Sequence, residues 1–450
     1  MNIKYHLKET IKLSVPISLG FIFHMMLGIV DSAMVGKLVG PVPLAASSLV
    51  NSLFIIILVL GIGMSVAITP LVAIAKGGGN KKYCGILLRN SLIVNLFFSF
   101  FLFAASYTVS FYLEYLDQPE EVVNLASSYM RIVSFSVFPL MIFQSYRQFL
   151  DGLGETIPPT VVNFLANFIN AAGNWILITG KFGMPRLELD GAGYATLITR
   201  IFVAVAIMLY VTKSDRFKVY NPYIQFKEIS AKVMRKIFQV GAPTSLQMFF
   251  EVGAFSLAAV MVGWISAKAL AAHQIALSLA SFTFLTTIGI ASTATIRVGN
   301  ELGRENYTEL KKTAYVALLM GVSLMFCFGV LFIILKNILP YIFVNDTEVI
   351  SIASSLLIIA AFFQIFDGAQ AVSLGILRGM VDVKIPMIIA FICYWIISIP
   401  LSYYLGFVIN WGVAGIWIAL SVGLVFAAVF FIFRIKTNLK KLLNTSPKAE

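Results

Sequence analysis

Residues 14–39 read SVPISLGFIFHMMLGIVDSAMVGKLV, an apolar stretch that carries a single acid, Asp31. A helix needs roughly 20 apolar residues to cross the hydrocarbon core of a bilayer, which is about 30 Å thick. Three lysines precede the stretch, at Lys4, Lys8 and Lys12, and no small-residue cleavage site follows it. We therefore expect these residues to remain in the protein as a first membrane helix, rather than to be removed as a signal peptide.

The composition of the whole chain extends this reading. Of the 450 residues, 59% are hydrophobic and only 12% are Asp, Glu, Lys or Arg, about half the charged share of a soluble domain. Such a chain has too little charge to cover a water-facing surface, which excludes a soluble globular protein and a disordered one. The three cysteines, Cys84, Cys327 and Cys393, lie in or beside apolar runs and support neither a disulfide framework nor a zinc site.

About a dozen apolar runs alternate with charged or Pro/Gly-rich breaks along the chain. We predict an all-α integral membrane protein with twelve transmembrane helices. Their approximate ranges are 14–39, 47–73, 88–113, 128–150, 158–180, 190–212, 238–264, 274–296, 314–338, 351–378, 385–407 and 412–435.

The net charge of +12 would suggest nucleic acid as a partner in a soluble protein, but its distribution indicates a membrane topology instead. If the N-terminus is cytoplasmic, the cytoplasmic segments contain 26 Lys and Arg residues and the outer loops contain five. This bias follows the positive-inside rule. We therefore predict a multi-pass protein with both termini in the cytoplasm and no nucleic-acid partner.

A weak internal repeat relates the two halves of the chain at a separation of about 227 residues. Residues 15–19 (VPISL) resemble residues 242–246 (APTSL), and the triplet MVG occurs at 34–36 and again at 261–263. Six helices per half make the two repeats parallel, an arrangement common in secondary transporters. The predicted parts are an N-terminal six-helix lobe (1–222), a C-terminal six-helix lobe (223–450) and a basic cytoplasmic linker (213–236).

Three acids lie inside predicted membrane helices: Asp31, Glu251 and Asp367. A carboxylate near the bilayer centre costs about 2.5–3.5 kcal/mol or more, so such a residue is by default an ion, proton or substrate site. Pairing with a buried base is the structural alternative. Arg131 and Arg200 also fall in predicted spans, and we expect them to pair with an acid or to extend toward the membrane surface.

Asp31 is predicted to share one layer of the N-terminal half with three neutral polar residues. Asn170 and Asn174 are four residues apart, hence on one helix face, and residue counting places Asp31, Asn174 and Thr196 at similar depth. An oxygen-rich pocket of this kind could hold a proton on Asp31 or a hard cation such as Na⁺. Alternatively, the amides only hold the helices together.

Glu251 and Asp367 are predicted to lie nearer the membrane midplane in the C-terminal half. If they face one cavity, we expect them to exchange a proton near neutral pH or to hold Na⁺. One helical turn earlier come Gln247 and Phe363, respectively. The Phe363 ring could face a cation, or it could be core packing.

Enzyme motifs do not fit the sequence. The segment 76–82 (KGGGNKK) is glycine-rich, but it lacks the Gly-Lys-Ser/Thr ending of a phosphate-binding loop and lies between apolar helices. There is no zinc-binding pattern and no nucleophile elbow. We therefore predict that the protein is not an enzyme, has no cofactor and uses an ion gradient for any uphill transport.

The residues discussed above resemble those of the multidrug and toxic compound extrusion (MATE) transporters, in particular the NorM-like branch, and the resemblance covers essentially the whole chain. It rests on Pro16 with the segment 31–36 (DSAMVG), Asn170 and Asn174, Pro243 with Gln247 and Glu251, and Asp367 with the segment 377–379 (LRG).

This resemblance implies two pseudo-symmetric six-helix lobes around a central cleft in the cell (inner) membrane. It implies a multidrug efflux antiporter that exports bulky, often cationic organic compounds in exchange for Na⁺ or H⁺ by alternating access. Asp31, Asn170, Asn174 and Thr196 match the family's N-lobe cation site, and Glu251 and Asp367 match its C-lobe acids. Phe363 departs from a strongly cation-coordinating pattern, since it lacks the hydroxyl of a tyrosine.

Small organic substrates and the lipid bilayer are the expected partners, and we expect a monomer without an obligate protein partner. Two other functions stay open. A flippase for a lipid-linked sugar would use the same architecture, but a pyrophosphate calls for buried Arg or Lys rather than acids. A non-transporting membrane receptor or scaffold is the other, although the sequence shows no soluble domain that could carry a signal.

Overall fold

The computed structural model describes residues 3–223 and 225–445, and within them it contains helices and no strands. These residues form two compact units. We call Leu19–Ser245 the N-terminal unit, and Met1–Ser18 together with Leu246–Glu450 the C-terminal unit. The predicted lobes 1–222 and 223–450 follow the repeat in the sequence, and they stay a prediction. The units defined by contacts have other boundaries, after Ser18 and after Ser245, and each boundary lies inside a helix.

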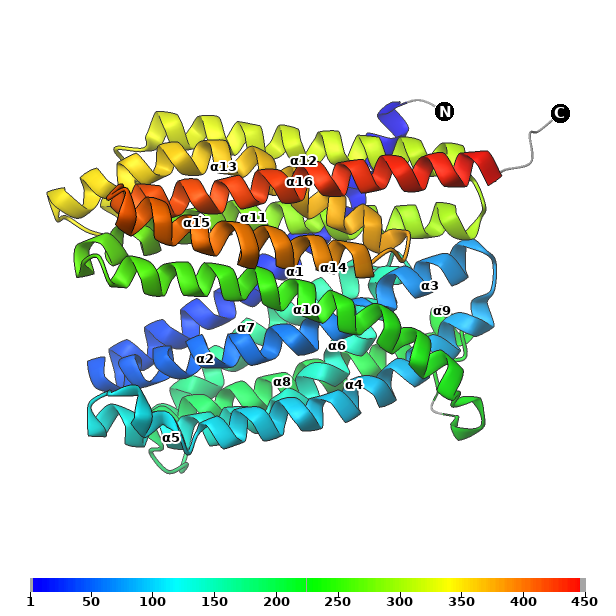
Figure 1. The fold of residues 1–450 in the computed structure, drawn as a ribbon. Helices are drawn as coiled ribbons and strands as arrows, with labels where there is room; N and C mark the ends of the chain where they lie inside the picture. Colours follow the sequence, from blue (N-terminus) through cyan, green and yellow to red (C-terminus); the bar gives the residue numbers. More distant parts are fainter. Residues whose placement is uncertain (1–2, 224, 446–450) are drawn as a thin grey trace. The chain divides into compact units, whose positions relative to one another are not determined.

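Figure 1 shows the helices in chain order. The first ten α-helices are α1 (Ile3–Leu38), α2 (Pro41–Val66), α3 (Ile68–Gly77), α4 (Lys81–Val109), α5 (Glu120–Phe135), α6 (Val137–Gly152), α7 (Ile157–Thr179), α8 (Glu188–Lys213), α9 (Asp215–Lys218) and α10 (Ala231–Gly263). The others are α11 (Ala267–Gly303), α12 (Tyr307–Leu335), α13 (Thr347–Gly379), α14 (Lys384–Phe391), α15 (Ile399–Tyr403) and α16 (Gly412–Thr445). Short 3₁₀-helices are η1 (Leu113–Leu116), η2 (Phe226–Glu228) and η3 (Leu339–Ile342), and two π-helices are η4 (Ile392–Ser398) and η5 (Tyr404–Val408).

The predicted membrane spans are confirmed in number. The described residues contain 11 helices that are long and apolar enough to cross a bilayer, and the bent pair α5–α6 makes a twelfth span. That pair bends by 41° at residue 136, between the two helices. Most helices begin before the predicted ranges, whereas α4 and α12 end before the predicted ranges do, at Val109 and Leu335. At about 1.5 Å per residue, the 36 residues of α1 are longer than the hydrocarbon core is thick.

In the N-terminal unit, α7 packs along α8, and α6 packs against α3, α4 and α8. Its apolar core includes Val35, Tyr129 and Leu140. Polar side chains of α1, α5, α7 and α8 lie within this packed layer, as described below. Because all four helices are held by apolar contacts, the polar groups between them occupy fixed positions.

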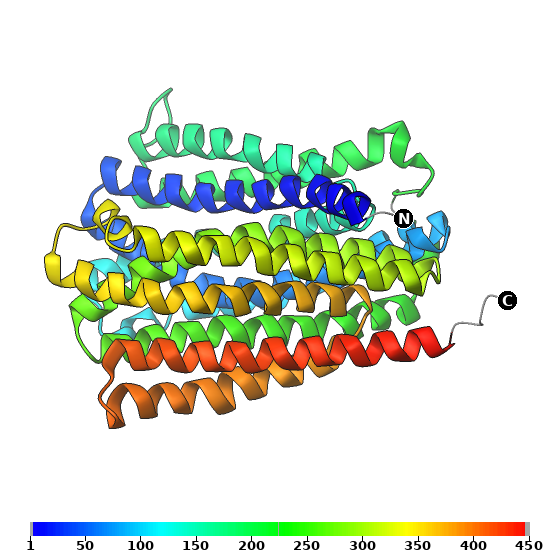
Figure 2. The same ribbon diagram turned by 90° about the horizontal axis from the view of Figure 1, so that it is seen from above.

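In the C-terminal unit, α13 is the central helix and packs against α11, α12 and α16. Helix α16, red in Figures 1 and 2, lies alongside the segment from α14 to η5, which is orange. Helix α13 is therefore covered on several sides, and this explains why its polar residues Gln364, Gln370 and Ser373 are fully buried.

Two long helices pass from one unit to the other. Helix α1 begins in the C-terminal unit and enters the N-terminal unit after Ser18, whereas α10 begins in the N-terminal unit and leaves it after Ser245. Each helix has a proline shortly before its division, Pro16 in α1 and Pro243 in α10. These are the prolines that the repeat aligned.

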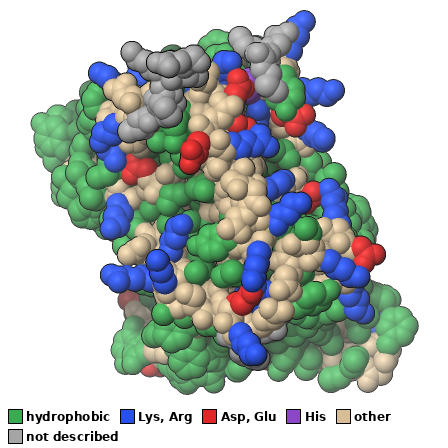
Figure 3. Space-filling model, turned by 90° about the vertical axis from the view of Figure 1, so that its right-hand side faces the viewer, with side chains coloured by type: hydrophobic (Ala, Val, Ile, Leu, Met, Phe, Trp, Pro, Cys, Tyr) green, Lys and Arg blue, Asp and Glu red, His purple; other side chains and the backbone are tan. Residues whose placement is uncertain are grey.

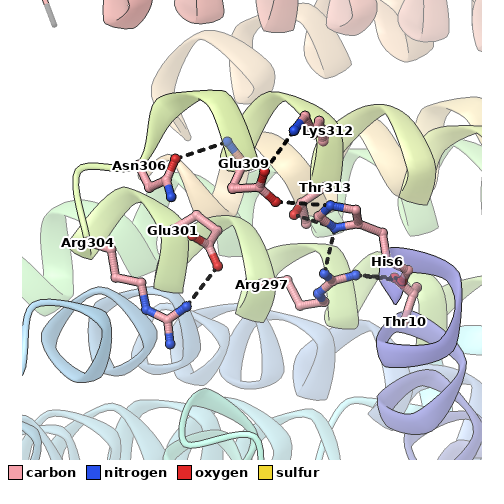
Figure 4. Close-up of polar contacts among 9 residues, drawn as sticks. All are labelled: His6, Thr10, Arg297, Glu301, Arg304, Asn306, Glu309, Lys312 and Thr313. Carbon is pink, nitrogen blue, oxygen red and sulfur yellow. Dashed lines mark hydrogen bonds and ion pairs between the residues drawn. The ribbon is translucent and has the colours of Figure 1, made fainter. Parts of the chain in front are cut away.

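The first turns of α1 are held in the C-terminal unit by a polar cluster, which we call the N-terminal anchor and define as His6, Thr10, Arg297 and Glu309 (Figure 4). Arg297, from α11, donates to the His6 carbonyl at 2.8 Å, to Thr10 Oγ1 at 2.6 Å and to His6 Nδ1 at 2.9 Å. His6 Nε2 lies 3.1 Å from Glu309 Oε2 of α12. Since Arg297 donates to Nδ1, that nitrogen carries no proton, and the ring proton is on Nε2, facing Glu309.

Candidate functional site

The structure brings the predicted polar residues of the N-terminal unit together around Asp31. Asn174 Nδ2 donates to Asp31 Oδ1 at 2.8 Å and also lies 3.1 Å from Asn170 Oδ1. The Tyr129 hydroxyl, from α5, lies 3.4 Å from Asp31 Oδ2, and it also interacts with the Thr196 hydroxyl of α8. Four helices thus contribute to one buried group of oxygen and amide atoms.

The chemistry of this cluster fits a proton or a small hard cation. Asn170 and Asn174 are fully buried and Asp31 is 6% exposed. The atoms Asn170 Nδ2 and Asn174 Oδ1 have no hydrogen-bond partner among the described residues, so the cluster keeps unused polar capacity. Carboxylate, amide and hydroxyl oxygens are the ligands that hard cations prefer.

No basic residue forms an ion pair with Asp31 within the part of the chain that the structure describes. Arg200 donates to Ser136 Oγ at 2.6 Å and lies 5.4 Å from the centre of the Phe54 ring. Arg131 lies 4.5 Å from the Phe111 ring. The structural alternative for Asp31, neutralisation by a direct salt bridge, is therefore not what these helices provide.

The C-terminal unit holds a second polar group, centred on Glu251, which is partly buried, and containing the buried side chains Gln247 and Gln370. Gln247 Nε2 donates to Glu251 Oε2 at 2.8 Å, and Gln370 Nε2 lies 3.5 Å from Oε1. Arg378 donates to Gln247 Oε1 at 2.5 Å. Gln247 thus stands between the guanidinium and the carboxylate, and the described residues show no direct ion pair at Glu251.

Asp367 lies on α13 near Glu251, and the two carboxyl groups interact electrostatically. Asp367 is 6% exposed, and no hydrogen bond from another described side chain reaches its carboxylate. Phe363, one turn earlier, packs in an aromatic group with Phe255 and Trp417 at ring-centre distances of 6.1 and 6.0 Å. Of its two predicted roles, these contacts favour core packing over facing a cation.

Sequence reasoning missed several buried polar residues. Tyr129 lies within the predicted span 128–150 and does not interrupt its apolar run, although a tyrosine is polar at its hydroxyl end. Asp151 falls just outside the predicted span 128–150, but it lies buried in the last turn of α6, and its carboxylate is 3.8 Å from Arg147 Nε. This buried acid is paired with a basic side chain, which distinguishes it from Asp31, Glu251 and Asp367.

Groups of three or more His, Cys, Asp or Glu side chains that could hold a metal ion are not found among the described residues. A cation at either site would therefore depend on one or two carboxylates supplemented by amide and hydroxyl oxygens. Such ligand sets suit Na⁺ or a proton better than a transition metal.

The comparison with family models decides which family of proteins this is. The model described as MatE matches residues 16–176 and again residues 243–404. The chain belongs to the MATE family. The two matches start 227 residues apart (243 minus 16), which is the separation of the repeat within the sequence.

Proteins named NorM resemble the MATE chain over almost its entire length. A probable multidrug resistance protein NorM of Bradyrhizobium diazoefficiens is 31% identical over 97% of this chain and 94% of its own length. One of Agrobacterium fabrum is 30% identical over 98% and 96%, respectively. These relatives confirm the predicted NorM-like branch and a transporter rather than an enzyme.

Solved structures confirm the fold. The crystal structure of the eukaryotic MATE transporter AtDTX14 superimposes with a TM-score of 0.89 at 21% identity and 98% coverage of both chains. An outward-facing multidrug resistance MATE family transporter gives 0.85 at 19% identity and 97% coverage of both. The fold prediction of an all-helical membrane protein with two lobes is therefore confirmed.

Proposed function

We propose that this MATE transporter is a cation-coupled multidrug efflux antiporter that exports bulky, often cationic organic compounds in exchange for Na⁺ or H⁺. One observation carries the proposal: Asp31, Glu251 and Asp367 lie in apolar helices, and none of them forms a salt bridge with a basic side chain in the described part of the chain. An unpaired acid at membrane depth is expensive to retain unless it takes up and releases a positive group.

The two polar groups support complementary steps of such a cycle. The Asp31 group in the N-terminal unit offers one carboxylate with amide and hydroxyl oxygens. The Glu251 and Asp367 group in the C-terminal unit offers two carboxylates. Alternating access would expose these acids to one side of the membrane at a time, so that drug and coupling cation compete for them, directly or through the conformation of the protein.

The energy available to the exchange is sufficient for useful export. One elementary charge that crosses 100 mV supplies about 2.3 kcal/mol, which corresponds to roughly a fiftyfold concentration ratio per coupled charge. The relatives named multidrug resistance protein support organic compounds as the exported class.

The distribution of charge supports an orientation with both termini in the cytoplasm of a cell whose inner membrane holds the protein. In the C-terminal unit, the start of α1 and the end of α16 lie at the same end of the helices (Figures 1 and 2). Figure 3 faces that end and shows Lys and Arg side chains spread over the surface. A basic surface of this kind fits the cytoplasmic side of a membrane.

The test is efflux of ethidium, a fluorescent organic cation, from proteoliposomes under an imposed Na⁺ or pH gradient. We expect gradient-driven efflux by the parent protein and a strong loss in Asp31→Asn, Glu251→Gln and Asp367→Asn. Asp117→Asn is the matched control, since Asp117 is exposed in an outer loop. Efflux that is unchanged in all three variants would remove the basis for the assignment, and binding of ethidium without any gradient-driven flux would favour a receptor.

A flippase for lipid-linked sugars is less well supported. A pyrophosphate headgroup would require basic side chains that are available for binding. Arg200 and Arg378 instead donate to Ser136 and Gln247, and each stands near an acid. The arrangement of charges therefore favours a positively charged substrate.

A further inference from the structure

The eleventh membrane span, Lys384–Val408, departs from regular α-helix next to the C-terminal acids. Residues Ile392–Ser398 form the π-helix η4. Pro400 follows two residues later and cannot donate a backbone hydrogen bond, which gives a local reason for the wider turn. π-helical turns are rare and occur frequently at functional sites.

This wider turn contains two consecutive residues, Cys393 and Tyr394, that are both fully buried. The ring of Tyr394 packs in an apolar group with Ala254, Phe363 and Leu424. Its hydroxyl, however, has no hydrogen-bond partner among the described residues. Buried tyrosines usually satisfy this group, so an unused phenol in the middle of a membrane domain requires an explanation.

The Tyr394 ring packs against the two helices that bear Glu251 and Asp367: its centre lies 6.4 Å from that of Phe255 on α10, and it shares an apolar group with Phe363 on α13, one turn before Asp367. The Tyr394 hydroxyl interacts electrostatically with both carboxylates. Glu251 is already held by two amides, from Gln247 and Gln370. Asp367 accepts no hydrogen bond from any other described side chain. Tyr394 on η4 thus has an unused hydrogen-bond donor, and Asp367 on the neighbouring helix α13 has an unused acceptor.

We propose that Tyr394 is a further binding-site residue of the C-terminal unit, whose phenolic O–H donates a hydrogen bond to the Asp367 carboxylate once the coupling cation has left it. The inference rests on the proposed cation exchange at Glu251 and Asp367. The hydroxyl stabilises the empty carboxylate and therefore competes with the cation. It thereby sets the affinity of the site and promotes release of the cation.

This role makes a specific prediction for Tyr394→Phe, which keeps the ring and removes only the oxygen. The empty carboxylate loses a donor, so the variant binds the coupling cation more tightly. We expect the cation concentration for half-maximal ethidium efflux to fall about three- to tenfold. The maximal rate should not rise, because the cation leaves more slowly.

The control is Tyr403→Phe, which removes the same oxygen from the same span at a side chain that is 54% exposed. A second readout does not depend on transport: the melting temperature of the purified full-length protein, measured over a series of Na⁺ concentrations or pH values, reports cation binding directly. Equal melting temperatures of the variants and the parent at saturating cation show that the variants are folded.

The outcomes separate this inference from the proposed function. If the parent shows no gradient-driven efflux, the proposed function fails. If the parent transports but Tyr394→Phe matches it in half-maximal concentration and in cation-dependent melting, Tyr394 has no part in the site. A weaker cation affinity in Tyr394→Phe would also overturn the inference, since it would make the oxygen a ligand of the bound cation instead of a competitor.

Discussion

Replacing His6 by alanine should release the first turns of α1 from the C-terminal unit. The variant removes the ring nitrogen that accepts from Arg297 at 2.9 Å and the contact of Nε2 with Glu309 at 3.1 Å. Arg297 keeps the His6 carbonyl and the Thr10 hydroxyl as acceptors, so no cation is left unpaired. A hydrogen bond to a charged group contributes about 1.5–3 kcal/mol, and the variant also loses the packing of a ring that is 2% exposed. We therefore expect the free energy of local opening of these turns to fall by about 2–4 kcal/mol.

Hydrogen exchange followed by mass spectrometry measures this loss directly, because local opening sets the exchange rate of the backbone amides. At about 1.4 kcal/mol per factor of ten, the amides of residues 3–18 should exchange about 30-fold to several hundredfold faster. Residues 19–38 of α1 belong to the N-terminal unit and should be much less affected. The control is His24→Ala, at an exposed position of the same helix.

Acidification of the parent protein should act in the same direction. His6 accepts from Arg297 only while Nδ1 has no proton, and a protonated ring would place a second cation beside the guanidinium. Burial, and then the charge of Arg297, lowers the pKa of His6 below its ordinary value of 6.5. The anchor should therefore be intact at and above that ordinary value and weaken only as the pH falls through the lowered pKa. Exchange in residues 3–18 that is the same in His6→Ala and in the parent, after correction for the intrinsic pH dependence, would refute this account of the anchor.

Three further predictions follow from other contacts. Asn174→Ala removes the side chain that donates to Asp31 at 2.8 Å and should reduce ethidium efflux about ten- to hundredfold. Asn51→Ala, at an exposed position of α2, should leave efflux unchanged. Equal efflux from the two variants would contradict a role for the site around Asp31. Gly85→Ala would place a Cβ 1.9 Å from the Tyr220 carbonyl oxygen and should lower the free energy of unfolding by about 3 kcal/mol. Gly79→Ala, in open space at φ +75°, should lower it by only about 1 kcal/mol. Chemical denaturation compares the two variants, and equal losses would argue against the close approach at Gly85. Hydrogen bonds from the Val349 backbone, then those of Glu348 and the charge of Lys268, hold the pKa of Asp346 below its ordinary value of 3.8. Asp346→Ala should therefore lower the melting temperature at neutral pH, and the difference should vanish as the pH falls through this lowered pKa; a difference that persists in acid would refute it.

The membrane spans were predictable because each depends on a local property, the length of an apolar run. The helix ends were less so. The apolar run of α1 begins near residue 14, but the helix itself begins at Ile3. Its first turns lie outside the apolar run and are stabilised by the polar contacts of the N-terminal anchor. The division of α1 and α10 between the units could not be predicted, since it depends on contacts between residues far apart in the chain.

The site was predictable for residues whose charge or spacing made them conspicuous. Asp31, Asn170, Asn174 and Thr196 were predicted to share one layer, and the structure places them there; their role in binding a cation stays a prediction. Tyr129 and Tyr394 were not found, because a tyrosine within an apolar run does not interrupt it. These two tyrosines differ from others in the spans because their hydroxyl groups lie near acids. For Tyr394 this position depends on the π-helix η4, which could not be predicted from the spacing of residues in the sequence.

The division of α1 and α10 also bears on how such a chain could have arisen from a shorter one. In this architecture, the opening part of the first helix of each repeat, in α1 as far as Ser18 and in α10 as far as Ser245, belongs to the other repeat's unit. A free-standing ancestor of half this length would have left those turns uncovered, unless a second copy exchanged the same segment with it. Gene fusion would then have made permanent an assembly in which neither half is complete alone.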